Sequence, residues 1–243
     1  MKELPTTTND LKTNYLLLHG YGEALEVWGR LEPFMDKNNQ YPINLIELFE
    51  DNNYSQSFEA LAKTIITQST KQPPPGTTII ANSMGGYIAM ELLHQNPGRF
   101  QQLILISTHP FADTPTKIRE RQREIALIGK GKAKLLGQLF SHPHQEAVKS
   151  NLANMWQQWS DKALTNALKA MITRVSRVET ILQSTVPIHF IIGQNDKSID
   201  IKQLESIANA CANTSLHLIP EQGHWQLHHW QPPFTKVLMQ CLA

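Results

Sequence analysis

A serine set among small residues is the first feature of this chain that could do chemistry. Ser83 stands in the segment ANSMGG, between the apolar run Thr77–Ala81 and a helical pattern over Ser83–Gln95. A serine on such a strand-to-helix turn projects its hydroxyl above the carboxyl edge of a sheet. The free N–H groups at the start of the helix favour negative charge beside it. We therefore expect a nucleophile; the alternative is that Asn82 or Ser83 only caps the helix.

A base and a carboxylate must accompany this serine, because a hydroxyl is a weak nucleophile until its proton is taken. His224 lies in the segment EQGHW, in a loop between the last expected strand and the last expected helix. Asp196 follows the apolar run Ile188–Ile192 in the segment GQND. Asp196 alone fits an Asx turn equally well, and Asp200 is expected to cap the following helix. Together these positions predict a catalytic Ser83–His224–Asp196 triad.

The segment HGYG, residues 19–22, ends the first apolar run and supplies a fourth component. Its glycines let the backbone turn sharply, so that an N–H group can point toward a developing oxyanion. Such a donor contributes on the order of 3–4 kcal/mol to the transition state. We expect the backbone N–H groups of Tyr21 and Met84 to be the two donors. Without Ser83, the same segment would be an ordinary strand-end turn.

No cofactor and no metal site are predicted. His224 and His228 have the i, i+4 spacing of a zinc motif, but the glutamate of H-E-x-x-H is missing. His228 and His229 are expected at the rim or the surface. Cys211 and Cys241, the two cysteines of the chain, form no metal or redox spacing. A reducing cytoplasm is the expected compartment.

Buried apolar runs that alternate with amphipathic helices predict an α/β fold with a doubly wound, mostly parallel sheet. The expected strands are Tyr15–Gly20, Pro42–Leu48, Thr77–Ala81, Leu103–Ile106, Ile188–Ile192 and Ser215–Ile219, and the helices between and after them include Ser55–Ser69, Ser83–Gln95 and Pro232–Cys241. The alternation fails over residues 109–180, where only helical patterns such as Pro115–Ile128 and Ala163–Val178 occur. We expect a helical lid there, inserted into a core formed by residues 1–108 and 181–243.

These motifs resemble those of the α/β-hydrolase superfamily, and in particular its small, lid-bearing, esterase-like serine enzymes. HGYG, NSMGG, GQND and GHW stand where that family keeps its oxyanion turn, nucleophile elbow, acid and base, in the family's chain order. The resemblance covers the chain from about Tyr15 to the end. It implies the fold and the triad of Ser83, Asp196 and His224, and it implies no particular substrate.

Two departures from the family pattern concern the surroundings of the triad. Ala81 and Asn82 replace the more usual Gly-His before the serine, and the loop of residues 47–52 lacks the common D-x-P-G-H-G-x-S stretch. Because of the second departure, the family pattern does not predict which residues form the far wall of the pocket. A serine at the elbow, where dehalogenases and epoxide hydrolases of this superfamily carry aspartate, speaks against both of those activities.

The substrate pocket is expected to be partly aromatic. Phe111, Trp156 and Trp159 could form its roof, although aromatic residues at helical spacing are more often core. His19, Gly20 and Trp225 complete the set of expected substrate-binding residues.

Charge divides the chain at the boundaries of the expected lid. The net charge is +1 over 243 residues, but residues 109–180 hold 12 Lys or Arg against 6 Asp or Glu. The remainder holds 10 against 15, so a basic lid stands on an acidic body. Either these charges form a solvated face, or they attract an anionic substrate or its carrier.

The leading hypothesis is a serine hydrolase that cleaves a small-to-medium carboxylic ester, with an anionic substrate as an option, through an acyl-enzyme. A triad-bearing lyase or C–C bond hydrolase acting on a carboxylated substrate is the related alternative. A non-catalytic, hydrolase-like binding protein is the alternative from another class. The near-zero net charge argues against a nucleic-acid binder, and no run approaches the ~20 apolar residues of a membrane span. Oligomeric state is left open.

Overall fold

A single parallel sheet of six strands forms the centre of this computed structural model, which describes residues 13–51, 57–67, 72–141 and 146–243. The strand order is β2-β1-β3-β4-β5-β6, and every neighbouring pair is parallel. The strands are β1 (Tyr15–Leu18), β2 (Gln40–Ile43), β3 (Thr77–Asn82), β4 (Phe100–Ile106), β5 (Ile188–Gly193) and β6 (Thr214–Ile219). The expected α/β fold with a doubly wound, parallel sheet is confirmed.

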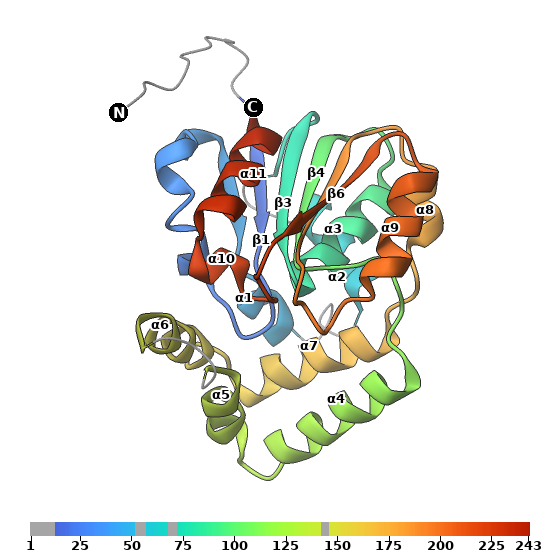
Figure 1. Cartoon of the computed structure of the whole chain (residues 1–243). Helices are drawn as coiled ribbons and strands as arrows, with labels where there is room; N and C mark the ends of the chain where they lie inside the picture. The colour runs from blue at the N-terminus through green and yellow to red at the C-terminus, as the bar shows by residue number, and fades with distance from the viewer. Residues whose placement is uncertain (1–12, 52–56, 68–71, 142–145) are drawn as a thin grey trace.

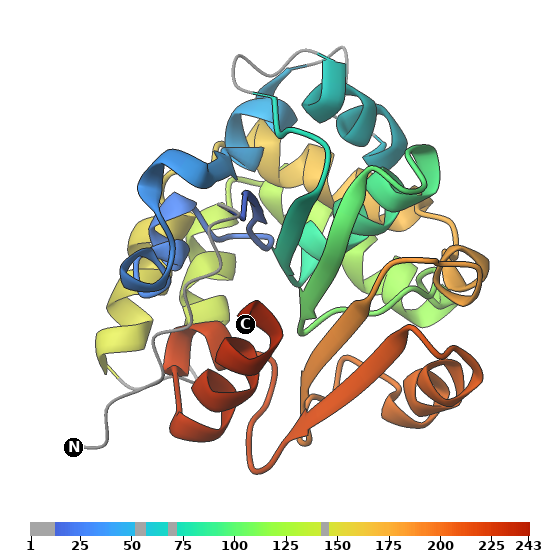
Figure 2. The same ribbon diagram turned by 90° about the horizontal axis from the view of Figure 1, so that it is seen from above.

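Helices cover both faces of this sheet (Figures 1 and 2). One face carries α2 (Phe58–Thr67), α3 (Met84–Gln95), α8 (Val178–Leu182) and α9 (Ile201–Ala210), which contact one another in that order. The other face carries α11 (Pro232–Leu242), which contacts β5 and β6 and follows the short helix α10 (Gln226–His229). Strands β1, β3, β4 and β5 are almost wholly buried between these layers, which is why they read as continuous apolar runs. Of the expected helix Ser55–Ser69, residues 55–56 and 68–69 lie outside the described part.

The predicted strand Pro42–Leu48 is wrong over most of its length. Strand β2 ends at Ile43, and helix α1 (Leu45–Glu50) begins two residues later. The side chain of Asn44 caps this helix by accepting a hydrogen bond from the N–H of Ile46 at 3.2 Å. An asparagine cap before the apolar residues Leu45, Ile46 and Phe49 outweighs their preference for a strand.

Four consecutive helices follow β4, and we call them the inserted helices: α4 (Pro115–Ile128), α5 (Ala133–Ser141), α6 (Glu146–Trp156) and α7 (Asp161–Thr173). Figure 1 shows them together below the sheet, beyond the carboxyl ends of the strands. Helix α7 packs against α1 and α4, and α5 packs against α6. The helix expected over Ala163–Val178 begins earlier because Ser160 caps it, and it ends at Thr173. Whether the inserted helices act as a lid stays a prediction.

The turn between β3 and α3 is closed by a backbone contact that only glycine permits. A Cβ atom on Gly85 would lie 2.1 Å from the carbonyl oxygen of Leu18, and one on Gly86 would lie 2.3 Å from the side chain of Thr108. The start of α3 therefore rests directly on the end of β1. This explains the two glycines that follow Ser83.

Among the helices of the described residues, none combines the length and the apolar character that crossing a bilayer requires.

Replacing Gly85 by alanine should lower the free energy of unfolding by about 3 kcal/mol, because the added methyl group meets rigid backbone. Denaturant titration measures the change. Gly129→Ala is the matched control, since a Cβ atom there would find no atom closer than 3.6 Å. Equal stability of the two variants would contradict the close approach of α3 to β1.

Candidate active site

Ser83 occupies the turn between β3 and α3 in a backbone conformation that is unusual for a residue with a side chain. Its φ is 48° and its ψ is −113°, and such strained positions are concentrated at functional sites. Its side chain does not cap α3. The Ser83 Oγ instead lies 2.9 Å from His224 Nε2, so the capping alternative does not describe this residue.

His224 and Asp196 come from two other loops at the same edge of the sheet. His224 Nδ1 lies 2.7 Å from Asp196 Oδ2, which completes a hydrogen-bonded relay from serine to imidazole to carboxylate. The second carboxylate oxygen accepts bonds from the N–H and the hydroxyl of Ser198, at 2.9 and 2.6 Å. Asp200 caps α9 by accepting a bond from the N–H of Gln203. The carboxylate that faces His224 is therefore Asp196.

The environment of Asp196 keeps this carboxylate ionised. Burial by itself would raise the pKa of Asp196, but the hydrogen bond and charge of His224 and the two bonds from Ser198 outweigh burial and lower the pKa. The carboxylate can therefore orient the imidazole and stabilise its protonated form.

The backbone N–H groups of Tyr21 and Met84, near Ser83, have no acceptor among the described residues. Met84 is the first residue of α3, where N–H groups are left without intrahelical partners. The N–H of Gly20 is already bound, since it donates to Glu23 Oε2 at 2.6 Å. The two expected oxyanion donors are thus unpaired within the described chain.

A buried carboxylate, Glu23, connects the segments that carry these groups. It accepts bonds from the N–H of Gly20, from Asn82 Nδ2 at 2.7 Å, and from His228 Nε2 at 2.7 Å. Burial opposes the charge of Glu23, but His228, Asn82 and Gly20 together lower its pKa to about 2. The expectation that His228 lies at the rim or surface is wrong, because its imidazole is buried against Glu23.

A cleft of about 1030 Å³ opens above Ser83 and His224. Of the expected substrate-binding residues, Phe111 and Trp225 line it. His229 also lines the cleft, consistent with a rim position. Further lining residues come from the inserted helices and from the loop after β5: Lys117, Glu120, Arg121, Glu124, Phe140, Met171, Lys197 and Ile199.

Four expected substrate-binding residues do not line this cleft: His19, Gly20, Trp156 and Trp159. His19 is fully buried, and its Nε2 accepts a bond from the N–H of Leu45 at 3.1 Å. Trp156 and Trp159 donate to the backbone carbonyls of Ala133 and Glu23 and pack in the core. The prediction is corrected for these residues: Trp156 joins α6 to α5, and Trp159 joins the segment after α6 to the loop that carries Glu23.

Tyr21 lines the cleft, and its hydroxyl is buried and has no hydrogen-bond partner among the described residues. Burial, followed by the nearby charge of Glu124, raises the pKa of Tyr21 well above its usual value. The group therefore stays protonated and offers one donor to a bound molecule.

Sequence reasoning missed a charged cluster on the wall of the cleft. Asp113 accepts a hydrogen bond from Arg121 Nε at 2.6 Å and forms an ion pair with Arg174, whose Nη1 lies 2.6 Å from Asp113 Oδ1. The guanidinium of Arg174 also stacks on Tyr87, 3.8 Å from the ring centre. Next to this cluster, burial and then the charge of Arg174 lower the pKa of His109 to about 3, so this imidazole is neutral. His109 follows β4, and its place at a strand end was the one signal that could have marked it.

A Ser–His–Asp relay at the carboxyl edge of a parallel sheet, with unpaired N–H groups beside the serine, defines an α/β hydrolase. The chain belongs to the family described as serine aminopeptidase, S33, whose model matches residues 50–229. This membership makes it a hydrolytic enzyme of the α/β fold.

The chain is also similar to individual proteins. It is 22% identical over 246 residues to the pimeloyl-acyl-carrier-protein methyl ester esterase of Pseudoalteromonas atlantica, a match that covers 91% of each chain. Among solved structures, a hydrolase from Oleispira antarctica superposes with a TM-score of 0.77 at 18% identity, covering 96% of this chain and 92% of that one. MenH from S. aureus gives 0.74 at 18% identity, covering 95% and 94%. These structures share the fold.

Glu23→Gln should destabilise the protein by about 2 kcal/mol near neutral pH, because a neutral amide cannot satisfy the three donors that bind the carboxylate. The folded-state pKa of Glu23, about 2, lies below the usual 4.5. Its stabilisation is therefore present above pH 4.5 and is lost as the pH falls toward 2.

Urea unfolding of both proteins at several pH values between 6 and about 2.5 measures this effect. The difference between wild type and Glu23→Gln should shrink over that range. The exposed neighbour Glu26 provides the control variant Glu26→Gln. A difference that stays constant with pH would contradict the role given to the Glu23 charge.

Proposed function

We propose that this protein is a serine hydrolase that cleaves a carboxylic ester through a Ser83–His224–Asp196 triad. The observation that carries the proposal is the continuous relay at the floor of the cleft, 2.9 Å from Ser83 Oγ to His224 Nε2 and 2.7 Å from His224 Nδ1 to Asp196 Oδ2. Both distances lie within the range of catalytic hydrogen bonds.

In the acylation step, Ser83 Oγ attacks the ester carbonyl carbon while His224 Nε2 takes the hydroxyl proton. The negative charge that develops on the carbonyl oxygen is stabilised by the N–H groups of Tyr21 and Met84. His224 then gives its proton to the leaving alkoxide, the C–O bond breaks, and an acyl-enzyme remains on Ser83. Water, activated by the neutral imidazole, hydrolyses that ester and restores the serine. Asp196 keeps the imidazole oriented and stabilises its charge in both steps.

The cleft favours a medium-sized substrate. Its volume of about 1030 Å³ exceeds what a short ester fills. Phe111, Phe140 and Trp225 offer apolar contacts for an acyl chain, and the unpaired hydroxyl of Tyr21 offers a donor to a polar group. The similarity to an esterase that acts on an acyl-carrier-protein methyl ester supports an ester with a carrier-bound or otherwise anionic acyl group.

In this proposal, the inserted helices act as a lid over the cleft. Two of their basic residues line the cleft and are paired with carboxylates, Arg121 with Asp113 and Lys117 with Glu120. Arg174, the residue after α7, also pairs with Asp113. Other basic residues of the segment point to solvent, namely Arg119, Arg123, Lys130, Lys132, Lys134, Lys162 and Lys169. The exposed leucines Leu127, Leu135 and Leu139 lie among them. Such a mixed basic and apolar surface suits an acidic protein carrier better than a small anion alone.

The same proposal includes a location of the protein in the cytoplasm. Cys211 and Cys241 are both free thiols, as a reducing compartment would keep them.

Ser83→Ala should reduce the turnover of a p-nitrophenyl ester by about 10⁴-fold or more, because the nucleophile of the acyl-enzyme is lost. A fluorophosphonate probe should label the wild type and fail to label the variant. Ser198→Ala is the matched serine control, and it should still react with the probe, although more slowly. Undiminished turnover in Ser83→Ala would overturn the proposed mechanism.

Those outcomes also separate the alternatives. Labelling of Ser83 without hydrolysis of any ester, together with turnover of a carboxylated substrate, would favour the lyase or C–C hydrolase. Absence of labelling in the wild type would favour the non-catalytic binding protein.

Ionic strength should affect charged and neutral esters differently. If the exposed charges of the inserted helices steer an anionic substrate, kcat/KM for a carrier-bound or dicarboxylate monoester falls roughly tenfold between low and physiological salt. For a neutral ester, kcat/KM stays constant. The pair of substitutions Arg119→Gln and Arg123→Gln should weaken the salt dependence.

Lys63→Gln with Lys202→Gln is the matched control pair, since both lysines are exposed and lie outside the inserted helices. If both pairs reduce the salt dependence equally, the steering comes from net charge and not from the lid.

A further inference from the structure

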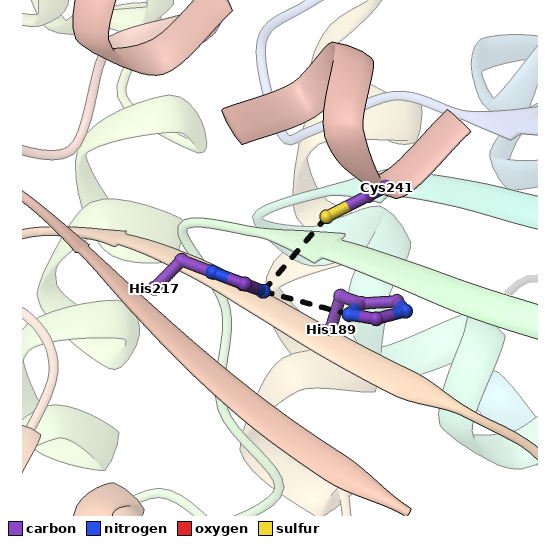
Figure 3. Close-up of side chains that lie close together, drawn as sticks. All are labelled: His189, His217 and Cys241. Carbon is purple, nitrogen blue, oxygen red and sulfur yellow. Dashed lines mark hydrogen bonds between the residues drawn. The ribbon is translucent and has the colours of Figure 1, made fainter. Parts of the chain in front are cut away.

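Three side chains with metal-binding atoms converge on the face of the sheet that α11 covers. They are His189 on β5, His217 on β6 and Cys241 on α11 (Figure 3). One ligand atom from each lies within 4.8 Å of the others. The residues are 24 or more positions apart in sequence, which is why no spacing motif reveals them.

The strand register brings the two histidines together. His189 is paired with Ser215, and His217 with Ile191, in the parallel pairing of β5 and β6. Positions two apart on a strand share a face, so His189 and His217 project to the same side as diagonal neighbours. The last turn of α11 places the Cys241 thiol above them, as Figure 3 shows.

The distances between the three ligand atoms are slightly longer than those between neighbouring ligands of a tetrahedral metal site. His217 Nε2 lies 3.5 Å from His189 Nδ1 and 3.8 Å from Cys241 Sγ. With Zn–N near 2.1 Å and Zn–S near 2.3 Å, a tetrahedral site has N–N and N–S separations of about 3.4 and about 3.6 Å. A cation would have to draw the most distant pair together by roughly 1 Å.

Hydrogen bonding alone satisfies this cluster poorly. His217 Nε2 faces both of the other groups, yet an imidazole nitrogen carries either one proton or one lone pair. It therefore cannot donate to both partners or accept well from both, and each contact is at the long limit for its type.

We propose that His189, His217 and Cys241 form a binding site for one divalent transition-metal ion of the zinc type. Two imidazole nitrogens and a thiolate are a donor set that zinc favours, and a water molecule supplies the fourth position. The half-buried histidines leave the site accessible from solvent. Burial holds the Cys241 thiol protonated, with its pKa raised to about 11; on binding, the cation displaces that proton to solvent and the thiolate coordinates it.

The site is separate from the cleft and independent of the proposed hydrolase activity. His189 is the second residue of β5, whereas Asp196 lies beyond the opposite end of that strand. His189, His217 and Cys241 do not line the cleft. A bound ion would join the C-terminal helix to two strands, and its effect would be on stability.

Cobalt substitution tests the proposal on the full-length protein. Co²⁺ added to the reduced, metal-free wild type should give tetrahedral d–d absorption and a thiolate-to-cobalt charge-transfer band, saturating at one ion per chain. Zn²⁺ should abolish both signals by displacement, and should raise the Tm. Cys211→Ser, which removes the other free thiol, should behave as the wild type.

Cys241→Ser should lose the charge-transfer band, and His217→Gln should lose saturable binding. Both should also lose the rise in Tm. Far-UV circular dichroism and cooperative urea unfolding like those of the wild type show that these variants are folded. If one of them is not folded, His189→Gln takes its place in the comparison. Absence of a thiolate band in the wild type, or a band that persists in Cys241→Ser, would overturn the proposal whatever the other variants do.

Discussion

The buried carboxylate of Glu23 is the interaction on which the geometry of the site depends most. It binds Gly20 in the loop after β1, Asn82 beside the nucleophile, and His228 in the helix that follows His224. A charge removed from water must be satisfied by several donors at once. Glu23 therefore holds together three segments that are far apart in the sequence, and these segments carry Tyr21, Ser83 and His224, the residues of the proposed mechanism.

A second buried charge arrangement connects the inserted helices to the body. Asp113 lies ahead of α4 and receives guanidinium groups from α4 and from the residue after α7. Arg177 makes a comparable two-bond contact with Glu91 on α3. Because a buried charge that loses its partner destabilises the fold strongly, these ion pairs hold α4, the end of α7 and α3 in fixed positions relative to one another. Arg121, Arg174 and Arg177 are thus held in ion pairs, and the exposed basic residues of the segment remain available to attract an anion.

Local patterns predicted most of the core fold, and they failed where a single polar side chain decides the outcome. The buried strands β1, β3, β4 and β5 carry continuous apolar runs that no solvent-exposed element would have. The segment after β2 has a similar composition, yet Asn44 turns it into a helix. Trp156 and Trp159 illustrate a different limit. Their spacing shows an apolar face, but whether that face meets the core or the cleft depends on how the helix is placed.

Residue types and their order along the chain are enough to propose Ser83, Asp196 and His224 as the reactive groups. The serine stands between a buried strand and a glycine-rich helix start, Asp196 and His224 follow later strands, and parallel strands deliver their following loops to one edge of the sheet. What surrounds these groups follows from the folded chain and not from local patterns. The bonds of Glu23 to Asn82 and His228, the ion pairs of Asp113 and the meeting of His189, His217 and Cys241 join distant residues through strand register and helix packing. A pattern among neighbouring residues cannot predict such contacts, because they form between residues that are far apart in the sequence and meet only when the whole chain has folded.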